Sequence, residues 1–190
     1  MIGAMEVEPA VKPMTEASFK EAISKEKHRN ARRLGLFRLI WASAFLALHF
    51  VSSKLLGNRG WEENLVLMAL YWGVALVYWL GRRSNGVARR GSLMIPFVDV
   101  PMIFAMQWLA LIPGENARGV AGFTVAIYIC LVLLSALSLQ ERQVWLTAGI
   151  GAALLGLIQF KAKETPEGIA SGLLLLGAAA AICQYSLRRW

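Results

Sequence analysis

Long apolar segments that alternate with short polar ones constrain this chain more than any other feature of its sequence. A helix needs about 20 mostly apolar residues to cross the ~30 Å hydrocarbon core of a bilayer. Six windows meet or approach this length, at 36–56, 64–81, 93–113, 119–139, 143–160 and 168–187. The breaks between them hold Gly, Pro and charged residues, which end helices. Because backbone groups in lipid must bond within their own segment, the predicted fold class is all-α, with six transmembrane helices.

Composition supports a polytopic membrane protein. Of the 190 residues, 57% are hydrophobic and 17% are charged, and the mean hydropathy is +0.51. A soluble domain of this length is less apolar. We therefore predict three parts: a cytoplasmic N-terminal segment at 1–34, a six-helix transmembrane domain at 35–187, and the start of a cytoplasmic linker at 188–190.

The distribution of basic residues predicts the orientation. With the N-terminus inside, fifteen of the 20 Lys and Arg residues lie on the cytoplasmic side and five lie outside. The positive-inside rule then gives an N-in/C-in topology. The net charge of +8 is concentrated at the ends of apolar segments, which favours anionic lipid headgroups over nucleic acid as the partner of these charges.

The N-terminal segment is predicted to form a basic helix. Ser18 and Glu21 have the spacing of a capping box, so the helix should begin near residue 16 to 18. Basic side chains recur through 20–33. This helix either lies against anionic lipid or contacts a partner domain, and the sequence leaves both open.

The window at 93–113 contains a carboxylate, Asp99, close to Pro101. A charge in hydrocarbon is costly, so such a residue normally has a partner or a function. Asp99 could cap a helix that restarts at Val100, or it could pair with Arg38 at the start of the first span. A proton-relay or ligand-binding role is the remaining alternative. Gln107, two turns later, has the same ambiguity.

Other intramembrane residues predict packing rather than chemistry. His49 is expected to hydrogen-bond within the bundle near Ser52 or Ser53, since a haem site generally needs a second ligand. Small residues that permit close helix contact recur at four-residue spacing, so they predict either internal packing or a dimer face. They are Ala148, Ala152, Gly156, Gly168 and Gly172. No catalytic residues, no metal ligands and no cofactor are predicted, because the motifs of nucleotide binding, hydrolysis and metal coordination are absent from the sequence.

The segments VDVPMIFAMQWLALIP and GFTVAIYICLVLLSALSLQERQVW resemble the six-span N-terminal membrane domain of bacterial class III adenylyl cyclases. That family has Arg residues leading into span one, an aspartate–proline pair early in span three, a glutamine further along it, and a SALSL-like end to span four. The residues that carry the likeness are Arg33, Arg38, Asp99, Pro101, Gln107, Ser135, Leu137 and Ser138. The resemblance covers about residues 30 to 190.

The resemblance implies a function and a location. It implies a homodimeric membrane anchor and signal-sensing module in a bacterial inner (plasma) membrane, followed in the full-length context by a cytoplasmic cyclase catalytic domain. This chain alone is not expected to make cyclic AMP, because the family's catalysis needs two metal-binding aspartates and Asp99 is the only aspartate here. The alternative is a small transporter or channel that uses Asp99 and Gln107; a membrane-domain enzyme is disfavoured by the lack of paired reactive groups.

Overall fold

The computed structural model describes residues 16–55, 59–81, 91–111 and 117–189. The elements in chain order are α1 (Glu16–Phe50), η1 (Val51–Leu55), α2 (Arg59–Gly81), η2 (Gly91–Leu93), η3 (Ile95–Asp99), α4 (Val100–Ala110), α5 (Ala117–Ala136), α6 (Glu141–Lys161) and α7 (Pro166–Arg188). Within these ranges the chain is helical with no strand, as predicted. Of the short elements, η1 and η3 are π-helical and η2 is a 3₁₀ turn.

Among the residues that the structure describes, five helices are long and apolar enough to cross a membrane. They lie within Ser24–Leu55, Asn64–Gly81, Ala117–Ala136, Glu141–Lys161 and Pro166–Arg188. Large apolar side chains face outward from them, including Val77, Phe160 and Leu174. An apolar surface of this extent suits contact with lipid, and it identifies a helical membrane protein by length and composition.

The third predicted span differs from the prediction. The window 93–113 was expected to be helical throughout, but the apolar helix runs from Ile95 to Ala110 only. Leu111 has left the helical conformation, with φ −77° and ψ 75°, and the sequence continues to Pro113 and Gly114, which oppose helix. At 1.5 Å per residue this helix is about 24 Å long, shorter than the ~30 Å hydrocarbon core.

The boundary predicted between residues 34 and 35 is not marked by any break in the backbone. Helix α1 runs continuously from Glu16 through Gly35 into the first apolar window. Gly35 is buried, and a side chain there would meet the ring of Tyr78, with an added Cβ 2.9 Å from Cε1. The glycine therefore allows α1 and α2 to approach closely instead of ending the helix.

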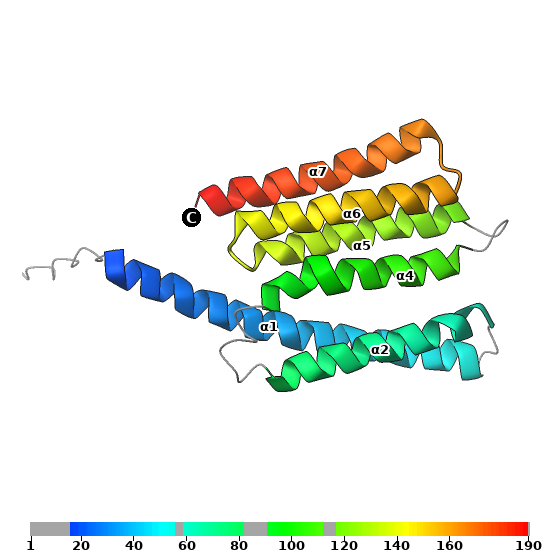
Figure 1. Cartoon of the computed structure of the whole chain (residues 1–190), viewed down its shortest axis with the longest axis horizontal. Coiled ribbons are helices and arrows are strands. Elements are labelled where there is room, and N and C mark those ends of the chain that lie inside the picture. Colours follow the sequence, from blue (N-terminus) through cyan, green and yellow to red (C-terminus); the bar gives the residue numbers. More distant parts are fainter. Residues whose placement is uncertain (1–15, 56–58, 82–90, 112–116, 190) are drawn as a thin grey trace, which may run out of the picture.

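Successive helices run antiparallel and form two units that meet at α4 (Figure 1). Helices α1 and α2 pack together as a hairpin, and α5, α6 and α7 pack together as a three-helix unit. Helix α4 lies between them and contacts α2 on one side and α5 and α6 on the other. The C-terminal end of α7 lies toward the same end of the bundle as the N-terminal half of α1, which projects beyond the other helices (Figure 1).

The core reflects these two units. The larger cluster fills the three-helix unit and reaches α1 and η3, with Tyr128, Leu155, Leu176 and Ala180 at its centre. A smaller cluster lies between α1 and α2, where Ala42, Met68 and Ala75 are buried. The hairpin and the three-helix unit thus have largely separate apolar cores, and Leu34 of α1 and Met106 of α4 are apolar residues that reach across their junction.

Candidate functional site

Two prolines shape the backbone that carries Asp99. Pro96 and Pro101 have no N–H to donate, so the regular helical hydrogen-bond pattern cannot continue through this stretch. The chain instead forms the π-helical turn η3, in which the Val100 N–H donates to the Ile95 carbonyl five residues earlier. Single π-helical turns often occur at functional positions because the extra residue redirects the side chains that follow. Asp99 is the last residue of this turn.

Asp99 forms a buried, two-pronged ion pair with Arg38 of α1. The guanidinium Nε donates to Oδ1 at 2.9 Å and to Oδ2 at 3.1 Å, and Nη2 donates to Oδ2 at 2.6 Å. The two side chains are 4% and 5% exposed. Of the two structural geometries that the sequence allowed, the ion pair is the one formed, since Asp99 stands at the start of α4 without a capping hydrogen bond from its side chain.

Helix α2 completes the site. The Tyr71 hydroxyl donates to Asp99 Oδ1 at 3.0 Å, and the Arg38 guanidinium carbon lies 5.4 Å from the ring centroid of Tyr78. The thioether of Met94 accepts from Arg38 Nη1 at 3.8 Å. A buried ion pair is stable only when additional hydrogen bonds satisfy both charges, and Tyr71 contributes such a bond. The site therefore ties together α1, α2 and the η3–α4 segment.

Sequence reasoning missed the two tyrosines. Tyr71 and Tyr78 are seven residues apart, which places them on one face of α2 two turns apart. That shared face was the available signal, but tyrosines are also common at membrane interfaces without any partner. Gly91 leaves the space that the Tyr78 hydroxyl occupies, because a side chain at this glycine would collide with that hydroxyl.

The other predicted polar residues do not join this site. Gln107 is half-buried on α4, eight residues after Asp99, or about 12 Å along the helix. His49 Nδ1 lies 2.9 Å from the carbonyl oxygen of Phe45, one turn earlier on the same helix. Within the described ranges, no three or more His, Cys, Asp or Glu side chains gather as a metal site would require.

The small residues have internal neighbours to different degrees. Ala148 belongs to the main core and Ala152 packs against it, whereas a Cβ at Gly156 would meet open space. Gly172 is buried against α6, and a Cβ there would lie 2.5 Å from Nε2 of Gln159. Gly168 faces the turn before α7, where a Cβ would lie 3.1 Å from a Glu164 carboxylate oxygen. The GxxxG pair of α7 is thus in contact with its own chain.

Comparisons with protein-family models, with curated proteins and with solved structures give no match. The geometry of the site and the sequence resemblance are therefore what a functional proposal can rest on.

Proposed function

We propose that this chain is a membrane anchor, dimerisation and signal-sensing module that transmits a conformational change through α7 to a cytoplasmic output domain. The proposal rests on its resemblance to the membrane domain of bacterial class III adenylyl cyclases. The observation that carries it is the buried contact of Arg38 with Asp99. These are two of the residues on which the resemblance depends, and they join helices from separate parts of the bundle.

A contact of this kind can hold the bundle in one of two arrangements. It lies where the α1–α2 hairpin meets the η3–α4 segment, and α4 in turn packs on α5 and α6. A ligand or a membrane property that favours one packing of the hairpin would shift the rest of the bundle, but only as far as it binds the two arrangements unequally. Packed interfaces switch between discrete arrangements, and a two-pronged ion pair provides one well-defined state.

The proposed topology has six membrane crossings with both ends inside, in a bacterial inner membrane. The η3–α4 segment is the sixth crossing, and its shortness can be accommodated by local thinning of the bilayer or by burial of its ends in protein. The exposed basic residues Lys25, Arg32 and Arg33 on the projecting half of α1 are then placed to contact anionic headgroups of the inner leaflet. A homodimer and a cytoplasmic cyclase catalytic domain are the proposed protein partners, and the chain itself contributes no catalysis.

The transporter or channel alternative has less support from the site. Both oxygens of Asp99 accept hydrogen bonds from Arg38, and one also accepts from Tyr71. An ion or proton pathway would have to break this arrangement, and Gln107 lies too far along α4 to share a ligand with the carboxylate.

The test is a fusion of a soluble class III cyclase catalytic domain after Trp190, with cyclic AMP measured in membranes that contain equal amounts of folded protein. We expect Asp99→Asn to change the output severalfold, because it weakens the ion pair with Arg38 while keeping the side-chain shape. Arg29→Gln is the matched control, since it removes an exposed ion pair with Glu26 on the same helix. Equal output from wild type, Asp99→Asn and Arg29→Gln would refute the proposal.

A further inference from the structure

Three helices present the same pair of exposed residues at one end of the bundle. Each pair has an arginine at that end and an aromatic side chain three or four residues away, toward the apolar part of the helix. The pairs are Arg33 and Phe37 of α1, Arg142 and Trp145 of α6, and Arg189 and Tyr185 at the end of α7. The three aromatic side chains are 42%, 48% and 59% exposed, in the same order. Residues at this spacing are neighbours on the surface of a helix.

The aromatic residues mark the level at which this end meets the membrane surface. Trp and Tyr are enriched where hydrocarbon meets headgroups, and a long arginine side chain extends from that level into the headgroup layer. Three or four residues correspond to about 5 to 6 Å along a helix. In the third pair, the Arg189 guanidinium carbon lies 4.9 Å from the ring centroid of Tyr185. The arginines therefore lie at the depth of lipid phosphates.

Tertiary contacts bring the three arginines around one turn, residues 137–140, which joins α5 to α6. On one side, the Asn30 amide of α1 donates to the Leu137 carbonyl at 3.2 Å, and Arg33 follows one helical turn later. On the other side, Arg188 pairs with Glu141 at 3.4 Å, which holds the end of α7 against the start of α6. The positive charges thus form two groups, one on α1 and one where α6 meets α7.

Carboxylates do not balance these charges within the part of the chain that the structure describes. None of the ion pairs between described residues includes Arg33, Arg142 or Arg189. The nearby carboxylate of Glu141 already accepts from Arg188 and from Gln184. A guanidinium donates two parallel hydrogen bonds to a phosphate, which is why arginine is favoured where phosphate is recognised. The charge at this end is therefore complementary to phosphate groups.

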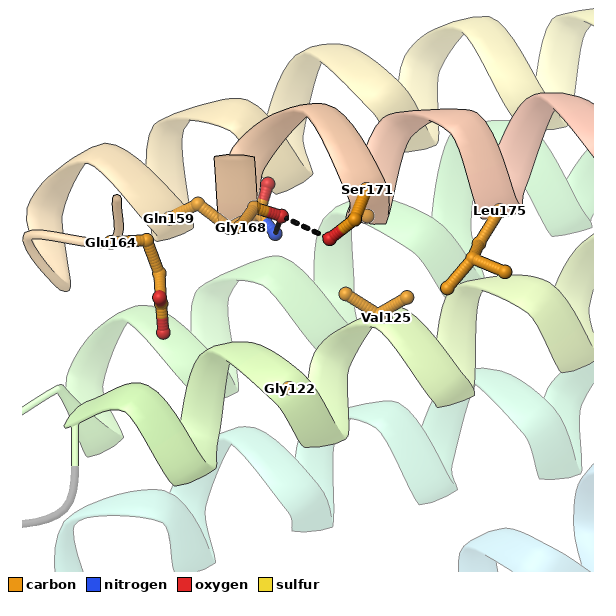
Figure 2. Close-up of a pocket in the computed structure, with 8 residues that line it drawn as sticks. Gly122, Val125, Gln159, Glu164, Gly168, Ser171 and Leu175 are labelled. Carbon is orange, nitrogen blue, oxygen red and sulfur yellow. Dashed lines mark hydrogen bonds between the residues drawn. The ribbon is translucent and has the colours of Figure 1, made fainter. Parts of the chain in front are cut away.

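The hollow at the opposite end of α6 and α7 has a different chemistry (Figure 2). The only charged residue in its lining is Glu164, which repels an anion. The two side-chain donors of the lining, the Ser171 hydroxyl and the Gln159 amide, both bond to the Gly168 carbonyl, at 2.9 and 3.5 Å. This hollow therefore does not suit an anionic headgroup, whereas the arginine end does.

We propose that the arginine end binds a phospholipid with two phosphates joined by a short linker, the chemistry of cardiolipin. One phosphate accepts from Arg33, and the other accepts from Arg142 and Arg189. The acyl chains then lie along the exposed aromatic side chains of the three pairs. Because the two phosphates are linked, binding of the first raises the effective concentration of the second at its own group of arginines. A lipid with a single phosphate lacks this advantage.

This inference rests on the proposed function only in taking anionic headgroups as the partner of the basic residues. It goes further by assigning a site shared by three helices and a lipid with two phosphates. Its test measures lipid binding rather than cyclic AMP. A fusion that does not respond to Asp99→Asn would therefore leave it standing, and a chain that shows no lipid preference would leave the fusion result unaffected.

The experiment compares the purified full chain in phosphatidylcholine nanodiscs that contain either cardiolipin or phosphatidylglycerol at equal phosphate content. Native mass spectrometry measures the lipid retained on the protein. We expect cardiolipin to be retained about tenfold more than phosphatidylglycerol. Arg33→Gln and Arg142→Gln should each weaken cardiolipin binding about fivefold, the loss of one basic contact at a membrane surface. The double variant should bind the two lipids equally.

Arg118→Gln is the matched control, because Arg118 is an exposed arginine at the start of α5, the opposite end of that helix. It should keep the preference for cardiolipin. Equal retention of the two lipids by the wild-type chain, or an effect of Arg118→Gln as large as that of Arg142→Gln, would overturn the proposal. A lipid-free dimer that Arg142→Gln dissociates would also overturn it and would assign this end to a second copy of the chain.

Discussion

At the residue scale, the pair of Arg38 and Asp99 shows how a membrane protein can hold two charges in an apolar setting. Each charge is desolvated, but the bidentate geometry and the Tyr71 hydroxyl replace the lost water. Such a pair adds little stability over an apolar equivalent, yet removing one partner leaves the other charge buried and unpaired. Its contribution is therefore mainly to specify which helix faces meet.

We expect Asp99→Ala to lower the free energy of unfolding by about 3–5 kcal/mol, because it leaves the Arg38 guanidinium buried without a counterion. The double variant Asp99→Leu with Arg38→Met should recover most of that loss, and Tyr71→Phe should cost only about 1 kcal/mol. Unfolding in detergent followed by tryptophan fluorescence measures all three. If Asp99→Ala were as stable as wild type, the pair would have no structural role.

At the scale of elements, contacts at the two ends of α6 join it to α4 and to α7. Lys161 at the end of α6 donates to the Trp108 carbonyl of α4 at 3.1 Å and lies 4.0 Å from the ring centroid of the same tryptophan. At the opposite end of α6, Glu141 accepts from Gln184 of α7 at 3.2 Å and pairs with Arg188. Between these ends, Gly172 sets the approach of α7 to α6.

Substituting Gly172 should therefore disturb the fold of one chain before it affects any dimer. Gly172→Leu has to displace the Gln159 amide, so we expect a loss of about 1–3 kcal/mol in unfolding free energy, typical of overpacking. Gly177→Leu is the control on the same helix, because a side chain there meets open space and should be tolerated. Crosslinking in membranes reports dimers separately. Unchanged stability with lost crosslinking would assign Gly172 to a dimer face instead.

At the scale of the whole molecule, antiparallel packing places the projecting half of α1 and the end of α7 toward one end of the bundle (Figure 1). A tertiary hydrogen bond from the Asn30 amide to the Leu137 carbonyl, at 3.2 Å, links α1 to the turn after α5 at this end. Under the proposed topology this end is cytoplasmic, and the α6–α7 turn lies outside.

Cysteine labelling in intact cells checks this orientation. In a chain whose own Cys130 and Cys183 are replaced by Ala, we expect an impermeant reagent to label Asn58→Cys and to spare Asn85→Cys, because the basic residues favour the cytoplasm for the 82–90 connection. Permeabilised cells, in which both positions should react, provide the control. The reverse pattern would invert the topology.

The sequence by itself determined the helices, because apolar length and helix-breaking residues are local properties. Four windows match helices to within about five residues at each end, with α5 ending at Ala136 and α6 beginning at Glu141. The window 36–56 matches only the second part of a continuous helix that begins at Glu16. The third window was predicted to extend to residue 113, beyond the helix end at Ala110, because hydropathy does not register the conformational limits near Pro113. The high cost of an isolated intramembrane charge was also enough to nominate Arg38 and Asp99 as partners before any contact was visible.

Only the tertiary structure decided how the helices are rotated about their axes, and the remaining features depend on that rotation. It brings Tyr71 and Tyr78 of α2 to the ion pair, and it turns Gly172 toward Gln159 rather than toward lipid. Hydropathy gives little information on rotation in a membrane, because lipid and protein interior are similarly apolar, so packing and a few polar contacts select the faces that meet.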